Sequence, residues 1–234
     1  MMKKIGILGA MDCEVERICA ALVNHTTETV NGIVFHLGKL GALEAVIAKT
    51  GEGKVNAAYS TTTMLCHFAP DAILNTGCMG GINPELHTLD VVIATSLCEH
   101  DLEYGVRGWP RGTVFLPGGD TVRDFAADMG LCSGLLTASR NVGVEPRLGV
   151  IVSGDQFISR EEDRERLRDI FLADGCEMEG AAVAHVCTLA KVPFAVVRSV
   201  SDGADSQSGI SFEEFAPRAG EVSAAILLGF AQLF

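Results

Sequence analysis

The sequence predicts an α/β fold in which a mainly parallel β-sheet is covered by helices on both faces. Two observations predict it. Short apolar runs alternate with longer segments of helical period, and these runs are continuously apolar, as in strands buried on both faces. With 234 residues, 48% of them hydrophobic, and no linker, repeat or low-complexity tract, the chain is expected to form a single domain over residues 1–234.

The first half of the chain supplies five apolar runs, with a helix after the first and after the third. A strand is expected over residues 5–8, followed by a helix in which Met11, Val15, Ile18, Cys19 and Leu22 share one face. Strands are expected over 34–37 and 45–49, on either side of the turn-rich "GKLGA". A helix over 54–68 then leads into strands in "DAILNTG" and "DVVIATS".

The second half begins with a segment that has no clear period. Residues 102–120 are dense in Gly and Pro and are expected to form a long loop or lid. Helical segments around 121–143 precede a strand in "LGVIVSG", and the charged "SREEDRERLRDIF" is expected to be a solvated helix capped by Ser159. "CEMEGAAVAHVCTLA" predicts a short strand and then a helix, "FAVVRSVS" a strand, and 212–234 a closing helix.

Charge and cysteine usage restrict the class of partner. A formal net charge of −12 argues against nucleic acid and anionic membrane surfaces, so a small molecule or another protein is expected. The start "MMKKIGILGAMDCEVE" is not a signal peptide, and no apolar run is long enough for a transmembrane helix, which indicates a cytoplasmic protein. The eight cysteines form no CxxC pair and are expected to remain thiols.

Polar residues follow several of the predicted strands, where ligands collect in α/β folds. They lie in "MDCE" after the first strand, and in "NTGCMGG", "SGDQFI", "EMEG" and "SVSDGAD" after later ones. Three carboxylates could converge on one cleft, namely Glu14, Glu179 (or Glu177) and Asp202. Alternatively, Glu14 and Glu179 cap the helices that follow them, Asp202 forms a turn with Ser201 and Asp205, and "NTGCMGG" is only a tight strand-to-helix turn.

Other chemistries find less support in the residues. "IGILGAM" lacks the full GxGxxG dinucleotide fingerprint, and "GEGK" lacks the first glycine and the final Ser or Thr of a P-loop. "CEHD" at 98–101 contains metal-ligand residue types but has no second cluster at metal-site spacing. His185 lies in an apolar helix and is interpreted as a core histidine.

Six segments, in this order, resemble the 5′-methylthioadenosine/S-adenosylhomocysteine nucleosidases, a branch of the purine nucleoside phosphorylase superfamily. They are "IGILGAMDCEVE", "TGEGKVNAA", "NTGCMGGI", "SGDQFI", "EMEGAAVAHVC" and "VVRSVSDGADSQSGISFEEF". The resemblance implies a single-domain, three-layer fold with a twisted mixed central sheet flanked by helices, and usually a homodimer whose partner completes the pocket. It also implies hydrolysis of the N-glycosidic bond of 5′-thio-substituted adenosines without a metal or organic cofactor.

The resemblance also implies residue roles. Asp202, helped by Ser201, would protonate adenine N7, and Glu14 would activate the attacking water. Glu179 would bind the ribose hydroxyls with Met178 packed on the sugar, while Phe157 would stack on adenine and the Ile158 backbone would read its edge. The other residues expected to contact the substrate are Met11, Glu52, Cys78, Glu177 and Phe212.

Two positions depart from the family pattern. Cys78-Met79 replaces the usual Ser-Ala, which exchanges a hydroxyl for a weaker hydrogen-bonding thiol. Glu52 replaces an apolar residue of the 5′-alkylthio pocket, and we expect it to favour a polar or cationic 5′ substituent or to pair with Arg107.

Two enzymatic alternatives and one non-enzymatic alternative stay open. A phosphate-dependent phosphorylase would share the fold but needs basic residues after the first strand, where this chain has Asp12, Glu14 and Glu16. A nucleosidase acting on a polar 5′-substituted adenosine such as aminodeoxyfutalosine is the second. A domain that binds nucleosides without turnover is the third, although it would have no need for Glu14, Glu179 and Asp202 together.

Overall fold

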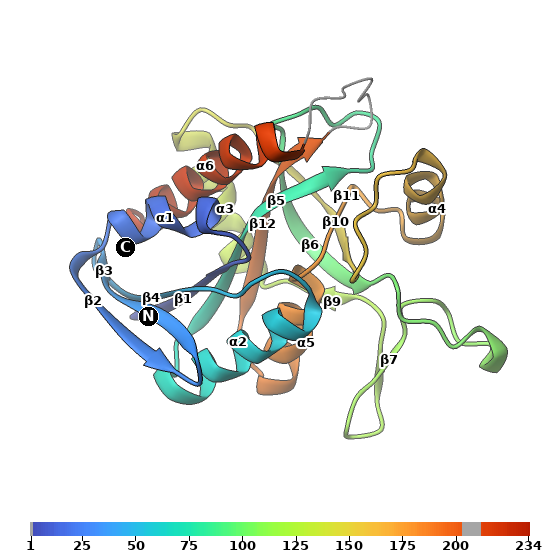
Figure 1. Cartoon of the computed structure of the whole chain (residues 1–234), viewed down its shortest axis with the longest axis horizontal. Helices are drawn as coiled ribbons and strands as arrows, with labels where there is room; N and C mark the ends of the chain where they lie inside the picture. Colours follow the sequence, from blue (N-terminus) through green and yellow to red (C-terminus); the bar gives the residue numbers. More distant parts are fainter. Residues whose placement is uncertain (1, 203–211) are drawn as a thin grey trace.

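The computed structural model describes residues 2–202 and 212–234, so Asp205 lies outside the described residues. Its centre is a mixed sheet of ten strands, drawn in Figure 1. The strands are β1 (Lys4–Gly9), β2 (Val23–Val30), β3 (Ile33–Leu40), β4 (Leu43–Lys49), β5 (Ala72–Gly81), β6 (Val91–Glu99), β9 (Phe125–Ala126), β10 (Arg147–Ser153), β11 (Gly175–Glu177) and β12 (Phe194–Asp202). Their order is β11-β10-β6-β12-β5-β1-β4-β3-β2, with β9 paired to β6.

Two parallel sets of strands meet at the centre of the sheet. β4, β1, β5 and β12 are parallel to one another, as are β6, β10 and β11. The two sets are antiparallel where β6 meets β12, and β11 pairs antiparallel with the end of β5 at Gly80 and Gly81. This second pairing closes one half of the sheet on itself and brings the ends of β5, β11 and β12 together.

Helices cover both faces, which confirms the predicted three-layer α/β class. In Figure 1, α1 (Asp12–Ala20) and α6 (Phe212–Ala231) lie on one side of the sheet, and α2 (Lys54–Phe68) and α5 (Gly180–Ala190) on the other. α3 (Met129–Asn141) packs against α6, and α4 (Glu161–Phe171) packs beside β10. β5 and β12 are buried along almost their whole length, as strands covered on both faces are.

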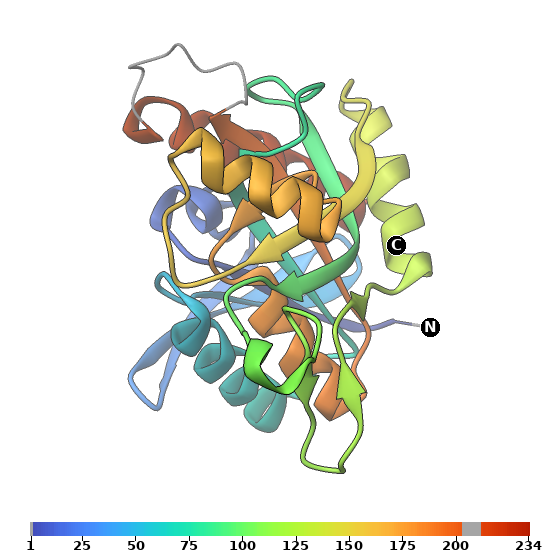
Figure 2. The same ribbon diagram turned by 90° about the vertical axis from the view of Figure 1, so that its right-hand side faces the viewer.

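Residues 102–122 form an irregular arm that projects from the body of the molecule. It contains the 3-10 turn η1 (Gly105–Arg107) and the short hairpin β7 (Val114–Phe115) and β8 (Thr121–Val122). Figure 2 brings this arm and α4 to the front. The expectation of a long loop without regular period over 102–120 is therefore largely confirmed.

Several local predictions were wrong. β2 was not predicted because its sequence "VNHTTETV" is almost entirely exposed and has no apolar run. "NTGCMGG" is not a turn but the second half of β5, held by pairing with β12 and β11. Helix α3 begins only at Met129, and α4 has Arg160 rather than Ser159 at its N-cap, with no side-chain cap.

All eight cysteines are free thiols, as predicted. Across the described residues, no helix is both long and apolar enough to cross a bilayer.

Candidate active site

A cavity that is partly open to solvent lies where the strand ends converge. Its walls come from the segments that follow β1, β4, β10, β11 and β12 and from the end of β5 itself. The lining residues are Ala10, Met11, Glu14, Glu52, Cys78, Met79, Gly80, Gln156, Phe157, Ile158, Cys176, Glu177, Met178, Glu179, Asp202 and Phe212. Five of these residues are acidic and, among the described residues, none of the lining is Lys or Arg.

Glu14 is buried in the first turn of α1, where it caps the helix and also lines the cavity. Its Oε2 accepts from the backbone N–H groups of Ala10 at 2.6 Å and Met11 at 3.0 Å. Its Oε1 accepts from the backbone N–H of Cys78 at 3.0 Å and from the thiol at 3.5 Å. Burial raises the pKa of the Cys78 thiol, so the sulfur keeps the proton that it donates to Glu14.

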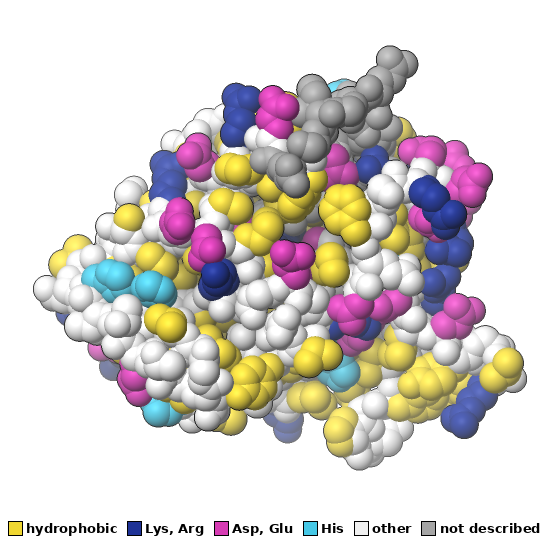
Figure 3. Space-filling view, in the orientation of Figure 1, with side chains coloured by type: hydrophobic (Ala, Val, Ile, Leu, Met, Phe, Trp, Pro, Cys, Tyr) yellow, Lys and Arg dark blue, Asp and Glu magenta, His cyan; other side chains and the backbone are white. Residues whose placement is uncertain are grey.

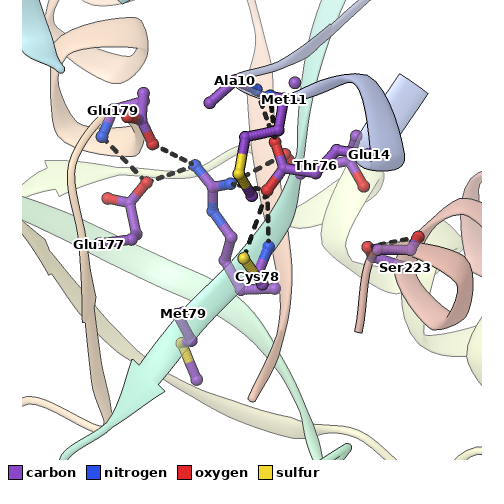
Figure 4. A network of polar contacts seen from close by, with 12 residues as sticks. Ala10, Met11, Glu14, Thr76, Cys78, Met79, Glu177, Glu179 and Ser223 are labelled. Atoms are coloured by element: carbon purple, nitrogen blue, oxygen red, sulfur yellow. Dashed lines mark hydrogen bonds and ion pairs between the residues drawn. The ribbon is translucent and has the colours of Figure 1, made fainter. Parts of the chain in front are cut away.

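Arg198 is a fully buried cation in the middle of β12, and sequence reasoning missed it. Its Nη2 pairs with Glu177 and lies 3.7 Å from Glu179 Oε2, while its Nη1 lies 3.9 Å from Glu14 Oε1. Its Nη1 also donates to the Thr76 carbonyl, at 2.8 Å. Figure 4 shows the result, with Glu177 and Glu179 on one side of this network and Glu14 and Cys78 on the other. The guanidinium therefore offsets part of the negative charge of the three carboxyl groups that share this buried site.

The two acids that follow β11 have different surroundings. Glu177 accepts from the N–H groups of Glu179 and Gly180 at the start of α5, and from the Ser153 hydroxyl. Glu179 Oε1 accepts one bond, from the N–H of Gly53 at 2.7 Å. Burial, and then the charge of Glu177, raise the pKa of Glu179 to about 8, so Glu179 holds a proton at neutral pH and can both donate and accept.

Gly77 makes room for this network. Its φ of +147° disfavours a side chain, and a Cβ built there would collide with Arg198 Nη1 and Glu14 Oε1. The close approach of β5 to the two side chains thus depends on the absence of a Cβ at this position.

Asp202, the last residue of β12, also lines the cavity. Its Oδ1 accepts from the Ser201 hydroxyl at 2.8 Å, and its Oδ2 accepts from Arg164 Nη2 at 2.8 Å. Burial is the largest influence and raises its pKa, while Ser201 and Arg164 act in the opposite direction. An acid with a raised pKa at the wall of a cavity is suited to proton transfer.

The remaining predicted contacts form the apolar side and the mouth. The rings of Phe157 and Phe212 meet edge to face, with their centroids 5.6 Å apart. Glu52 is exposed at the mouth, and within the described residues it forms no ion pair with Arg107. Lys54, two residues further on, pairs instead with Glu99 and Asp101.

Eleven of the twelve predicted site residues line this one cavity, and Ser201 contacts it through Asp202. Strand-end position was the signal that found the carboxylates. Arg198 could have been found as a charged residue inside the buried run "FAVVRSVS", and Arg164 as the residue three positions before Leu167 and seven before Phe171 on one helix face. Cys176, which also lines the cavity, gave no signal beyond its position at a strand end.

Comparisons with known proteins agree with this geometry. The family described as "Phosphorylase superfamily" matches residues 4–232. A 5′-methylthioadenosine/S-adenosylhomocysteine nucleosidase of Halalkalibacterium halodurans is 38% identical over 233 residues, and an aminodeoxyfutalosine nucleosidase of Campylobacter jejuni is 36% identical over 227 residues. Each alignment covers 97% of both chains. The structure of the Neisseria meningitidis 5′-methylthioadenosine/S-adenosylhomocysteine nucleosidase in complex with methylthio-immucillin-A superimposes with a TM-score of 0.93, at 34% identity, over 100% of both chains.

Proposed function

This chain belongs to the phosphorylase superfamily and, within it, to the 5′-methylthioadenosine/S-adenosylhomocysteine nucleosidases. We propose that residues 1–234 form one unit that hydrolyses the N-glycosidic bond of 5′-thio-substituted adenosines. The products are adenine and the free ribose derivative. The observation that carries the proposal is that one cavity is lined by two sets of carboxyl groups, each with its own buried arginine. Asp202, whose pKa is raised by burial, pairs with Arg164, while Glu14 and Glu179 both lie near Arg198.

Asp202 is the proton donor to adenine N7 in this proposal. Adenine leaves poorly as an anion, so a proton on N7 lowers the barrier to cleavage of the C1′–N9 bond. Burial at the end of β12 favours the protonated acid that this step needs, and the Ser201 hydroxyl fixes its orientation.

Glu14 acts on the other side of the sugar. Departure of the base leaves positive charge on the ribose, which a carboxylate stabilises while it orients water toward C1′. The N–H groups of Ala10, Met11 and Cys78 hold Glu14 in one position, and Arg198 balances its charge in the buried site. Two carboxyl groups thus divide the work as in glycoside hydrolysis, except that the acid protonates a purine nitrogen.

Binding of the nucleoside follows from other residues that line the cavity. Glu179, protonated near neutrality, can both donate to and accept from ribose hydroxyls, with Met178 beside the sugar. Phe157, held edge to face by Phe212, offers a ring for the purine, and Ile158 offers its backbone.

Water is the better nucleophile for this site than phosphate. A phosphorylase must hold a dianion, whereas five carboxyl groups and, among the described residues, no basic side chain line this cavity. The test incubates the protein with methylthioadenosine with and without phosphate and measures adenine and sugar products. Equal rates and free methylthioribose support hydrolysis, whereas a phosphate requirement and sugar 1-phosphate would establish the phosphorylase.

A second substrate class is favoured by the exposed carboxylate of Glu52 at the mouth. The C. jejuni relative is named for a nucleoside with a different 5′ group, aminodeoxyfutalosine. The same assay with S-adenosylhomocysteine, 5′-deoxyadenosine, adenosine, inosine and aminodeoxyfutalosine ranks the 5′ groups by kcat/KM. Activity on inosine alone would contradict the choice of adenine as the leaving base.

We also propose that two copies of the chain form a homodimer through the arm at 102–122. Val106, Trp109 and Phe115 of the arm are exposed, and Figure 3 shows clustered hydrophobic side chains on this projection at the lower right. The Trp109 and Phe115 rings pack edge to face at 5.2 Å, which gives the apolar surface a fixed shape. Light scattering coupled to gel filtration tests the dimer, and Trp109→Ser should weaken it.

The free thiols support a reducing compartment, and we propose that the protein acts in the cytoplasm. Fractionation of cells that produce the chain would test this location.

A further inference from the structure

Arg164 is a second buried cation of the site, and it comes from an unexpected face of α4. The helix "EEDRERLRDIF" buries three side chains, Arg164, Leu167 and Phe171, along one stripe. Leu167 and Phe171 pack into the hydrophobic cluster that includes Ile158 and Cys176. Arg164 is 5% exposed on the same stripe, although a buried arginine is costly unless it is paired.

Arg164 is paired with the acid itself, Asp202. Arg164 Nη2 lies 2.8 Å from Asp202 Oδ2, and the two side chains are 6% and 16% exposed. The cavity lining includes Asp202 but, among the described residues, does not include Arg164. Arg164 thus contacts the proposed proton donor without being part of the surface that would contact a nucleoside.

Among the described residues, few charged or titratable groups act on the Asp202 carboxyl. The charged or titratable described residues that influence it are Arg164 from α4 and, through its thiol, Cys176 from β11. Its own strand contributes the Ser201 hydroxyl. Burial raises the pKa of the Cys176 thiol to about 12, so that group is neutral at physiological pH, and Arg164 is the principal charge among the described residues that acts on the carboxyl.

In the proposed reaction, the charge of Asp202 changes when the proton passes to N7. The O–H bond of Asp202 breaks as the N7–H bond forms, and the electrons of the C1′–N9 bond pass to the departing purine. A neutral carboxylic acid becomes a carboxylate, and solvent returns the proton after adenine leaves. A guanidinium has only donors, so it binds a carboxylate much better than a carboxylic acid.

We propose that Arg164 is a positioning residue for proton transfer, which stabilises the carboxylate that Asp202 becomes when it gives its proton to the purine. The inference rests on the proposed function, because it assigns Arg164 to the step in which Asp202 acts as an acid. The interaction is stronger after proton transfer than before it, and it therefore favours the transition state over the bound substrate.

The test compares Arg164→Met and Arg164→Lys with the wild-type chain over a range of pH. The substrates are methylthioadenosine and a 4-nitrophenyl 5-methylthioriboside, whose leaving group departs without protonation. Loss of the cation makes Asp202 a weaker acid, so for Arg164→Met we expect kcat on the nucleoside to fall about tenfold at low pH. The alkaline limb of the kcat profile, where kcat falls as pH rises, should move to higher pH by about one unit or more.

The two further readouts separate proton transfer from a merely structural role. Hydrolysis of the nitrophenyl riboside should change less than about threefold in Arg164→Met, because no proton is needed. Arg164→Lys should keep the limb near its wild-type position, since it keeps the positive charge. Arg166→Met, on the exposed side of the same helix, is the matched control and should behave as wild type.

The inference would be overturned if the alkaline limb of the kcat profile stayed at its wild-type pH in Arg164→Met. It would also be overturned if kcat fell equally on the nucleoside and on the nitrophenyl riboside. Should Arg164→Met fail to fold, Arg164→Gln gives the same comparison with a neutral side chain that can still donate a hydrogen bond. A wild-type chain that releases no adenine would instead refute the proposed function, and the inference with it.

Discussion

The backbone N–H of Cys78 donates to Glu14 Oε1 over 3.0 Å, although the two residues are 64 positions apart. The same carboxylate accepts from Ala10 and Met11 in its own helix turn. Glu14 is therefore fixed by two elements at once, α1 and β5. A group that must orient water toward one carbon atom benefits from this rigidity.

Glu14→Gln should lower kcat at least about a hundredfold with little change in KM. The amide keeps the shape but loses the negative charge that stabilises the ribose cation and accepts a proton from water. Steady-state release of adenine from methylthioadenosine measures the effect. Glu16→Gln, exposed on the same helix, serves as control and should keep its activity. Near-normal kcat in Glu14→Gln would exclude Glu14 from water activation.

Asp202→Asn should lose most turnover, by about 10²- to 10⁴-fold in kcat, because an amide cannot give a proton to N7. Calorimetry with methylthio-immucillin-A, the ligand in the N. meningitidis structure, should still detect binding. Asp169→Asn, exposed on α4, controls for the loss of a carboxylate elsewhere. If Asp202→Asn turned over at the wild-type rate, the acid would have to be another group.

The strand ends were predictable because alternation of strands and helices determines which residues lie at the carboxyl edge of the sheet. Glu14, Glu179 and Asp202 were found in this way, and their roles came from the resemblance to a family. The sequence left open whether Glu14 and Glu179 cap helices or face a cleft. Glu14 does both, since it accepts the N–H of the N-cap residue Met11 and lines the cavity. Glu179 lines the cavity without a side-chain cap, and Glu177 accepts from the first N–H of α5 instead.

The burial of Arg198 and Arg164 could have been read from local pattern, but their ion-pair partners could not. Each lies on an apolar face whose period indicates only burial, and its partners come from distant strands. β2 was missed for the opposite reason. It is an exposed edge strand held by pairing with β3, and the β2 sequence itself carries no apolar run.

Gly77→Ala should lower both stability and activity. The added Cβ would meet Arg198 and Glu14, so the network must shift, at a cost of about 1–3 kcal/mol in the free energy of unfolding. Chemical denaturation and adenine release measure the two effects. Gly229→Ala, in α6 with ordinary contacts of 3.5 Å or more, should be neutral or slightly stabilising. Unchanged activity in Gly77→Ala would mean that the network tolerates displacement.

Glu179 should make the folded state less stable as pH rises. Its pKa of about 8 exceeds the ordinary value of 4.5, so the folded state binds more protons than the unfolded state between these values. The stabilisation is complete below about pH 4.5 and is lost as pH rises toward 8, at up to about 1.4 kcal/mol per pH unit. Urea denaturation from pH 5 to 8 measures the slope, and Glu179→Gln should flatten it.

Glu161→Gln, exposed at the start of α4, is the control for that slope and should leave it unchanged. A wild-type slope identical to that of Glu179→Gln would show that Glu179 is ionised throughout this range.

Glu52→Ile should change the preference for the 5′ substituent rather than the rate of cleavage. Glu52 lies at the mouth of the cavity, exposed and without an ion pair to Arg107 within the described residues, so its charge is available to a substrate. We expect kcat/KM for methylthioadenosine to rise and that for a 5′-(2-aminoethylthio) analogue to fall, with a combined change of about five- to tenfold, because an exposed ion pair contributes about 1 kcal/mol. Glu52→Gln keeps the shape without the charge and should reproduce the loss on the cationic substrate alone. An unchanged ratio of the two kcat/KM values in Glu52→Ile would mean that Glu52 is turned to solvent during binding and has no part in selecting the 5′ group.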